Sequence, residues 1–368
     1  MKILVLTSHS PSLFWFRLDM MKSFVEKNHE VMAVGNEPES KWCEKLKRYQ
    51  VQYKQITISR NSLNPFKDLI TLSSIKSVIR DYQPDKIFTY QAKTVVYGGI
   101  AANQLGIKEV YPLIAGVGSL FLSNDIKTRV VRKITIAGYR LSMRNCPAVF
   151  FQNHEDENNF IKTKVIKNQK RVFLRGSGVN LDRFAQQSLP DTVGFLCTCR
   201  LIKDKGVFEY IEACRIIKKN NPNVRCMLLG PFDSNPTSIK PKELQVFIDE
   251  GTIEYFGEQE DVRPYLERCS VFVLPSYREG TSKAVLEAMS SGKAIITTNA
   301  PGCVETVDDN LNGLMVPVKD VQSLANAMQY MIDNPARLQE MASHARSKAE
   351  EQFDVNKVNA TICETMGL

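Results

Sequence analysis

Two glutamates beside a predicted helix N-terminus are the residues of this chain best placed for chemistry. Residues 271–274 form an apolar run typical of a buried strand, and a polar turn then leads to a helix that Thr281 or Ser282 can cap. A strand, a glycine-bearing loop and a helix N-terminus together present backbone N–H groups and a positive dipole end to an anion. Glu279 and Glu287 flank that end. Because a carboxylate repels a phosphate, we expect both to bind hydroxyls, which predicts a nucleotide-sugar with its phosphates in the middle.

The same segment resembles a known enzyme family. Glu279 and Glu287 have the E-x7-E spacing of the retaining glycosyltransferases of family 4, which have the GT-B fold. The flanking PSYREG and LEAMSSGKAIITT are similar to that family nearly residue for residue. The resemblance implies transfer of a sugar from a nucleotide donor to an acceptor hydroxyl with retained anomeric configuration. It implies that Glu279 holds hydroxyls of the donor sugar and Glu287 the ribose, and that the helix N-terminus at Gly280, Thr281 and Ser282 faces the diphosphate.

Two basic residues follow a second predicted strand, residues 194–199. Arg200 and Lys205 match the family's R-x4-K-G pattern, and their spacing at a strand end places two cations beside a bound diphosphate. These cations and the helix N-terminus can stabilise the charge that develops on the leaving nucleoside diphosphate. The sequence has no Asp-x-Asp at a strand end, so we expect an enzyme that needs no metal and no cofactor besides its UDP-sugar co-substrate. In the family, the loop from Gly257 to Val262 packs on the nucleobase.

Candidate acceptor contacts lie in the first half of the chain. No enzymic nucleophile is evident, which favours a front-face mechanism in which the departing phosphate helps to deprotonate the acceptor; His9 is an alternative general base. Arg17 matches a family position, and residues 115–119 resemble the glycine loop of the family's acceptor domain. The simpler interpretations are that Arg17 lies on the surface, that Lys93 is solvated and that residues 115–119 form an ordinary tight turn. The residues predicted to contact the acceptor are His9, Arg17, Lys93, Gly116 and Gly118.

The composition is that of a globular protein. The 368 residues are 43% apolar and 24% charged, and they allow two domains with substantial cores. No apolar run approaches the roughly 18 residues that span a bilayer, and the N-terminal run is typical of a strand rather than a signal peptide. The nine cysteines are odd in number and scattered, and the four histidines form no metal motif. Reduced thiols in a cytoplasmic protein are therefore expected.

Charge is distributed unevenly along the chain. Up to Pro190 there are 29 Lys and Arg against 15 Asp and Glu, whereas the remainder has 19 against 25. A basic half joined to an acidic half indicates that the basic half meets an anionic partner. No nucleic-acid recognition motif is present, so an anionic membrane surface or a pyrophosphate lipid fits better.

One basic segment, residues 120–145, is a candidate membrane-binding surface. Basic charge beside exposed aromatic and apolar residues, including those at 120–122 and 13–16, is typical of a membrane-surface patch. An ordinary core helix with a solvated face is the alternative. The predicted apolar stripe is Ile126, Val130, Val131 and Ile134, and the basic set is Lys127, Arg129, Arg132, Lys133, Arg140 and Arg144.

Strands and helices alternate through both halves, which predicts an α/β protein of two doubly wound, Rossmann-like domains. We expect an acceptor-binding domain at residues 1–188 and a nucleotide-sugar-binding domain at residues 189–352. The resemblance implies that the two domains face each other across a cleft and that the last helix, within residues 353–368, crosses back to the first domain.

The predicted activity is transfer of a sugar, with N-acetylhexosamine as the best guess, from a UDP-sugar to a polyprenyl-diphosphate-linked saccharide. The nearest resemblance is to bacterial transferases that build O-antigen, capsule or glycoprotein glycans on undecaprenyl diphosphate. This implies a peripheral protein on the cytoplasmic face of the plasma membrane. A nucleotide-sugar 2-epimerase shares the fold but needs carboxylates and histidines in the first domain that the sequence does not place. A glycogen-type phosphorylase would be far longer, and a non-catalytic scaffold would not need Glu279, Arg200 and Lys205 together.

Overall fold

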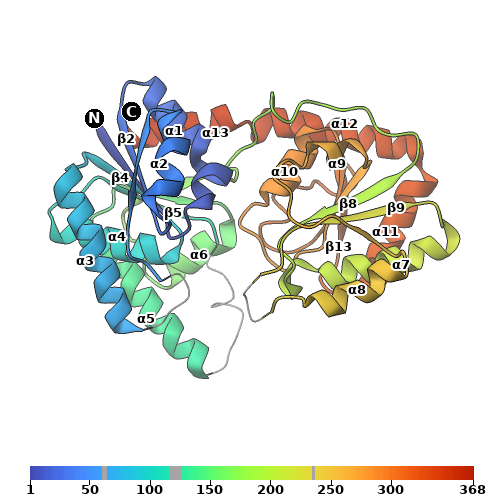
Figure 1. Cartoon of the computed structure of the whole chain (residues 1–368), viewed down its shortest axis with the longest axis horizontal. Coiled ribbons are helices and arrows are strands. Elements are labelled where there is room, and N and C mark those ends of the chain that lie inside the picture. The colour runs from blue at the N-terminus through green and yellow to red at the C-terminus, as the bar shows by residue number, and fades with distance from the viewer. Residues whose placement is uncertain (60–63, 117–125, 234–236) are drawn as a thin grey trace. The chain divides into compact units, whose positions relative to one another are not determined.

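The computed structural model describes residues 1–59, 64–116, 126–233 and 237–368 (Figure 1). They fold as two compact units, one formed by Met1–Ser177 with Val358–Leu368 and the other by Gly178–Lys357. Each unit is a parallel sheet covered by helices, which confirms the predicted pair of Rossmann-like domains. None of the helices in the described part of the chain combines the length and apolarity that crossing a bilayer requires.

The first unit contains, within the described residues, a seven-stranded parallel sheet in the order β3-β2-β1-β4-β5-β6-β7. Because the order reverses between β1 and β4, the loops after these two strands lie where doubly wound sheets bind ligands. Leu6 at the end of β1 is opposite Thr89 near the end of β4. The strands are β1 Lys2–Leu6, β2 Glu30–Gly35, β3 Val51–Gln55, β4 Lys86–Tyr90, β5 Val110–Ile114, β6 Ala148–Phe151 and β7 Lys170–Phe173.

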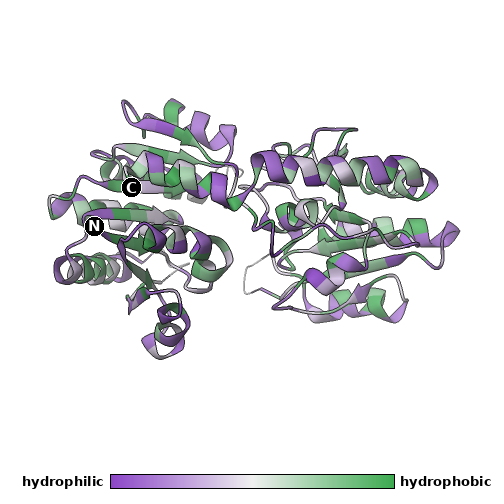
Figure 2. Ribbon diagram, turned by 90° about the horizontal axis from the view of Figure 1, so that it is seen from above, coloured by the Kyte–Doolittle hydropathy of each residue, from purple (hydrophilic) through white to green (hydrophobic). Residues whose placement is uncertain are grey.

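Helices cover both faces of this sheet, so its strands are apolar on both sides (Figure 2). One face packs against α1 Leu18–Glu26, α2 Glu39–Lys47 and the C-terminal helix α13 Val355–Met366. The other face packs against α3 Pro65–Tyr82, α4 Ala92–Gln104, α5 Ile126–Ser142 and α6 His154–Lys162. Helix α4 lies between α3 and α5 and packs against both.

The second unit has, in its described residues, a six-stranded parallel sheet in the order β10-β9-β8-β11-β12-β13, built around one apolar core. Its strands are β8 Gly194–Thr198, β9 Arg225–Leu229, β10 Glu254–Tyr255, β11 Val271–Leu274, β12 Ala294–Thr298 and β13 Gly313–Val316. Its helices are α7 Val207–Asn220, α8 Pro241–Asp249, α9 Arg263–Glu267, α10 Lys283–Ser290, α11 Val321–Asp333 and α12 Pro335–Gln352.

The change from the first unit to the second comes at Gly178, earlier in the chain than the predicted boundary at 188 and 189. The reason is a backbone pairing with the C-terminal segment. The Val179 N–H donates to the Phe353 carbonyl at 2.8 Å, and the Val355 N–H donates to the Val179 carbonyl at 3.0 Å. Helix α13 begins beside this pairing in the second unit, and its part from Val358 onwards belongs to the first unit, as the resemblance implied.

The helical segment after the β1 loop has two parts. A π-helical turn, Leu13–Arg17, precedes α1. Because a π turn holds more residues than an α turn, it shifts the phase of the side chains before α1. The prediction that residues 13–16 are exposed is therefore wrong for Leu13, which is fully buried. Trp15 and Phe16 are the aromatic residues that remain exposed here.

Candidate active site

An ion pair joins two loops at the carboxyl edge of the second sheet. The Lys205 Nζ lies 2.5 Å from the Glu279 Oε1, and both side chains are largely buried, at 17% and 11% exposed. Lys205 follows β8 and Glu279 follows β11, and these two strands are neighbours in the sheet. Two of the residues predicted from the sequence to do chemistry are thus brought into direct contact.

The loop that carries Lys205 is fastened to the strand end that carries Glu279. The Asp204 carbonyl accepts hydrogen bonds from the Tyr277 N–H at 2.9 Å and the Ser276 hydroxyl at 3.2 Å. Gly206 adopts φ +69°, and a Cβ there would lie 2.1 Å from the Pro275 carbonyl oxygen, so only glycine fits. The glycine of the R-x4-K-G pattern therefore sets the distance between the two loops.

A second close contact holds Glu279 from the other side. Its N–H donates to the Pro301 carbonyl at 2.9 Å. Gly302 adopts φ +82°, and a Cβ there would lie 2.1 Å from the Glu279 carbonyl oxygen. The Gly302 N–H in turn donates to the Glu305 carboxylate at 2.7 Å. The Pro301-Gly302 pair, which marks a tight turn, is the one local signal for this loop in the sequence.

Arg200 has a carboxylate partner that sequence analysis missed. Its Nη1 lies 2.7 Å from the Asp233 Oδ2, and the arginine side chain is 47% exposed. Asp233 lies beyond β9, and no local sequence signal links it to Arg200. Both predicted phosphate-binding cations therefore have carboxylate partners in the chain itself.

Helix α10 begins at Lys283, with Ser282 in the N-cap position. The Ser282 side chain makes no capping hydrogen bond, although capping by Ser282 or Thr281 was expected. The first N–H groups of a helix have no acceptor within the helix, and a negative charge near them is favoured by the helix dipole. Gly280 and Thr281 connect this helix start to Glu279.

Glu287 lies half-buried within α10. Burial raises the pKa of its carboxyl group to about 7, which the charges of Lys283 and Arg183 oppose and that of Asp261 reinforces. The two glutamates of the E-x7-E spacing therefore have different surroundings. Glu279 faces an ammonium group, whereas Glu287 is desolvated and titrates near neutral pH.

The loop predicted to meet the nucleobase is shaped by backbone contacts. The Gly257 carbonyl accepts a hydrogen bond from the Gly230 N–H at 2.8 Å. Val262 is the N-cap residue of α9 and packs against the core of the second unit. A cavity of about 380 Å³ beside α9 is lined partly by Arg183 and Asp261, the residues whose charges act on Glu287.

Arg17, predicted as an acceptor contact, is buried rather than exposed. It is 2% exposed, and its guanidinium carbon lies 5.0 Å from the Tyr90 ring centroid and 5.7 Å from that of Phe88. Burial lowers the pKa of Arg17 to about 10. Among the described residues, its buried Nε has no hydrogen-bond acceptor. The aromatic faces, which attract cations, are its neighbours.

The other predicted acceptor residues lie at the carboxyl edge of the first sheet. The His9 ring packs edge-on against Trp15, with ring centroids 5.6 Å apart. The Lys93 ammonium lies 2.7 Å from the Asp68 carboxylate, which joins α4 to α3. Gly116 follows β5 and is exposed, and Gly118 lies outside the described residues, as do residues 120–122. Their acceptor roles stay predictions.

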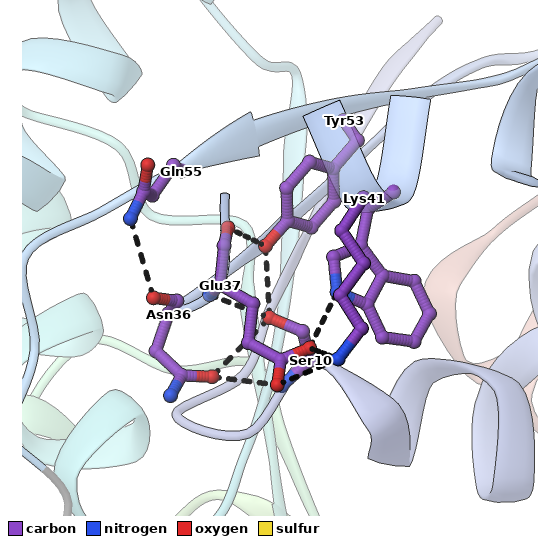
Figure 3. A network of polar contacts seen from close by, with 7 residues as sticks. Ser10, Asn36, Glu37, Lys41, Tyr53 and Gln55 are labelled. Carbon is purple, nitrogen blue, oxygen red and sulfur yellow. Dashed lines mark hydrogen bonds and ion pairs between the residues drawn. The ribbon is translucent and has the colours of Figure 1, made fainter. Parts of the chain in front are cut away.

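The loop after β1 has no glycine, and side-chain hydroxyls hold it in place (Figure 3). The Ser10 Oγ lies 2.8 Å from the Tyr53 hydroxyl, which donates to the Glu37 carbonyl at 2.7 Å. The Asn36 side chain accepts from the Ser10 N–H at 3.0 Å. A second set of bonds reaches β4, because the Gln91 Oε1 accepts from the Ser8 N–H at 2.9 Å. The loop is therefore fixed to the ends of β2, β3 and β4.

Comparison with known proteins agrees with this architecture. Residues 180–350 match the family model of the glycosyl transferases group 1, and residues 2–153 match that of the glycosyl transferase 4-like proteins. The chain belongs to the glycosyltransferases. Anabaena HepE in complex with UDP has a similar structure, with a TM-score of 0.79 at 19% identity and full coverage of both chains. This glycosyltransferase thus has the GT-B fold that the resemblance implied.

Two bacterial relatives align with most of this glycosyltransferase. The N,N'-diacetylbacillosaminyl-diphospho-undecaprenol alpha-1,3-N-acetylgalactosaminyltransferase of Campylobacter jejuni is 26% identical, over 97% of this chain and 96% of its own. The UDP-Gal:alpha-D-GlcNAc-diphosphoundecaprenol alpha-1,3-galactosyltransferase of Escherichia coli is 24% identical, over 82% of this chain and 79% of its own. Among the described residues, no group of three or more His, Cys, Asp and Glu side chains is arranged to hold a metal ion.

The raised pKa of Glu287 predicts a pH-dependent stability. Between its ordinary pKa of 4.5 and about 7, the folded protein holds a proton that the unfolded chain releases, so the free energy of unfolding falls as pH rises through this window. Replacing Glu287 with Gln should therefore stabilise the protein by about 1–3 kcal/mol near pH 8 and have little effect near pH 5, as measured by urea unfolding. Glu212→Gln, at an exposed carboxylate of α7, is the control. Equal pH dependence in the two variants would contradict the assignment.

Proposed function

We propose that this glycosyltransferase transfers a sugar from a UDP-sugar to a polyprenyl-diphosphate-linked saccharide, with retention of anomeric configuration. The observation that carries the proposal is the Lys205–Glu279 pair at the carboxyl edge of the second sheet, beside the start of α10. A cation for a phosphate, a carboxylate for sugar hydroxyls and a helix N-terminus are the three groups that binding a nucleotide-sugar requires.

On this proposal the donor diphosphate becomes the partner of Lys205 and Arg200. Lys205 then turns from Glu279 to a phosphate oxygen, and Glu279 accepts hydrogen bonds from hydroxyls of the donor sugar. Arg200 likewise leaves the Asp233 carboxylate and binds the diphosphate. Glu287 contacts the ribose, and its pKa near neutrality lets its carboxyl group either donate to or accept from a hydroxyl.

The chemical step on this proposal is a front-face substitution. The bond from the anomeric carbon to the leaving phosphate breaks while the acceptor oxygen attacks from the same side, and the departing phosphate oxygen takes the acceptor's proton. Lys205, Arg200 and the start of α10 stabilise the charge on the leaving diphosphate in place of a metal ion. His9 is the alternative proton acceptor.

The first unit is proposed to bind the acceptor. The basic charge of the first half of the chain suits a diphosphate-linked lipid, and both relatives described above are named for undecaprenol-linked acceptors. N-acetylhexosamine is the donor sugar we favour, because the Campylobacter jejuni relative is named as an N-acetylgalactosaminyltransferase. Arg17, Lys93, His9, Gly116 and Gly118 are the proposed acceptor contacts.

A panel of UDP- and GDP-sugars, each with and without a polyprenyl-diphosphate-linked saccharide, tests the activity. We expect one UDP-sugar to release UDP. NMR should show the same anomeric configuration in the product linkage as in the donor, and the rate should not fall when EDTA is added. Inverted product would contradict retention. Epimerised donor without transfer would indicate a 2-epimerase, and no nucleotide release from any donor would indicate a non-catalytic scaffold.

Breaking the ion pair should abolish most of the activity. Lys205→Met removes a charge that stabilises the leaving group, and Glu279→Gln removes the negative charge and one of the two oxygens that accept from donor-sugar hydroxyls, so each should lower kcat/KM by about 10²–10³-fold. Arg225→Met in the second unit is the matched control, because Arg225 also forms an ion pair with a glutamate, at 2.5 Å to Glu254, but begins β9 at the opposite edge of the sheet. Loss of activity in the control alone would count against the site.

We also propose that α5 binds the cytoplasmic face of an anionic membrane. Its residues include no acidic side chain, and Arg129, Lys133, Arg140 and Arg144 on this segment are exposed. Val130, Ile134 and Leu141, each one position further along, form an exposed apolar stripe beside this basic row. A basic row next to an apolar stripe is typical of helices that lie in a membrane interface. Val131 is half-buried, and the side chain of Ile126 lies outside those described.

Charge reversal on α5 tests this proposal. Replacing Arg129, Arg132 and Lys133 with Glu should weaken binding to phosphatidylglycerol vesicles by about 10²-fold or more at low salt, since each cation near such a surface contributes about 1 kcal/mol. Reversal of three lysines on α2, Lys41, Lys45 and Lys47, is the control, because α2 covers the other face of the sheet. Unchanged vesicle binding in the α5 variant would refute the patch.

A further inference from the structure

The start of α3 exposes three large apolar side chains that the sequence analysis did not select. Phe66, Leu69 and Ile70 are 77%, 62% and 53% exposed. Further along the same outward side of α3, the exposed residues are Ser73, Ser77 and Arg80. The exposed surface of α3 is thus apolar only in its first two turns, at the end nearest the carboxyl edge of the sheet.

These two turns are held firmly to the rest of the unit. The Asn64 side chain caps α3 by accepting from the Phe66 N–H at 2.9 Å. Asp68, on the inner side of the same turns, forms the 2.7 Å ion pair with Lys93 at the start of α4. The apolar side chains therefore project from a helix start that is capped and joined to α4.

The start of α3 and the helix α5 belong to the same layer. Both pack against α4, on the same face of the first sheet (Figure 1). In a parallel sheet every crossover helix begins at the carboxyl edge, so the starts of α3, α4 and α5 lie along one edge. Phe66, Leu69 and Ile70 therefore lie at the same edge as Val130 and Ile134, the first exposed apolar residues of α5.

We propose that Phe66, Leu69 and Ile70, here called the α3 anchor, insert into the anionic bilayer beside α5. This inference rests on the proposed function, to which it adds a second membrane contact of a different chemical kind. The occupant is a bilayer because the neighbouring helix presents cations with no acidic side chain of its own, which complements an anionic headgroup layer. A protein groove that received a whole helix face would be expected to cover more than two turns of apolar surface.

Insertion of the α3 anchor would orient the first unit with its proposed acceptor contacts towards the membrane. His9, Lys93 and Gly116, the proposed acceptor contacts, follow strands at the edge where the anchor lies. Insertion of the anchor would bring this edge to the depth of the headgroups, where the diphosphate of a polyprenyl lipid is located. The Asp68–Lys93 pair links the anchor directly to one of these contacts.

Co-sedimentation with vesicles of phosphatidylglycerol and phosphatidylethanolamine tests the anchor. The triple variant Phe66→Ser, Leu69→Ser, Ile70→Ser should lower the partition coefficient by about tenfold or more, because it removes apolar area that enters the membrane. This loss should persist at high salt, whereas the loss caused by α5 charge reversal should shrink as salt screens the charges. The matched control replaces Ile161, Val246 and Tyr330, three exposed apolar residues elsewhere in the chain, with Ser.

A second variant keeps the surface apolar and reports insertion directly. Phe66→Trp should show quenching by brominated lipids above the level of the wild-type tryptophans, and Val246→Trp should not. Equal partitioning of the triple variant and its control, or equal quenching in the two tryptophan variants, would overturn the proposal. A wild-type dimer that the triple variant converts to a monomer in analytical ultracentrifugation, without a change in vesicle binding, would overturn it in favour of a second copy of the chain.

The vesicle assay needs neither donor nor acceptor, so it is independent of the enzymatic assignment. If no donor is turned over but vesicle binding depends on the anchor, only the proposed function fails. If transfer to a long-chain acceptor in vesicles proceeds equally in wild type and triple variant, only the anchor's role fails. Transfer to a short-chain, water-soluble acceptor should be unchanged in the triple variant.

Discussion

The second unit holds a pairing of opposite charges that, on the proposed function, the donor replaces. Lys205 and Glu279 are largely buried, and they form an ion pair with each other. Such a pair contributes little net stability, because its desolvation roughly offsets its attraction, but an uncompensated charge left behind would cost about 3–5 kcal/mol. A diphosphate for Lys205 and sugar hydroxyls for Glu279 would replace both partners at once. The contacts at Gly206 and Gly302 fix the geometry in which that exchange can occur.

Three acidic groups of the candidate site differ in their surroundings. Glu279 faces an ammonium group, Asp233 accepts from an exposed guanidinium, and Glu287 is desolvated enough to bring its pKa to about 7. Groups of the same chemistry can then take different roles at one pH, a charged partner in one place and a neutral hydrogen-bonding group in another. These differences follow from which loops pack around each carboxyl group.

The sequence predicts what depends on local pattern. The strand at 271–274, the loop and helix start after it, and the alternation that gives two Rossmann-like units are all encoded in neighbouring residues. The Arg200–Asp233 and Lys93–Asp68 pairs are not, because they depend on which strands and helices become neighbours in space. Burial of Arg17 likewise follows from a π turn that has no clear sequence signature. The absent glycine in the loop after β1 is understandable only once the hydroxyl network of Ser10 and Tyr53 is seen.

On these proposals the two units bind anions in different ways, and the difference follows from the size of what each would bind. A diphosphate is small, so a few oriented groups with low exposure, Lys205 foremost, give both affinity and position. A bilayer is large and its charges are mobile, so many exposed cations acting together suit it better than any one aligned bond. Electrostatic attraction to such a surface does not fix the orientation of the protein, however. Binding through α5 alone would leave the first unit able to rotate about the helix. Insertion of apolar side chains from a second helix, as proposed for α3, would remove that freedom, because they would enter the membrane at a fixed place on the unit.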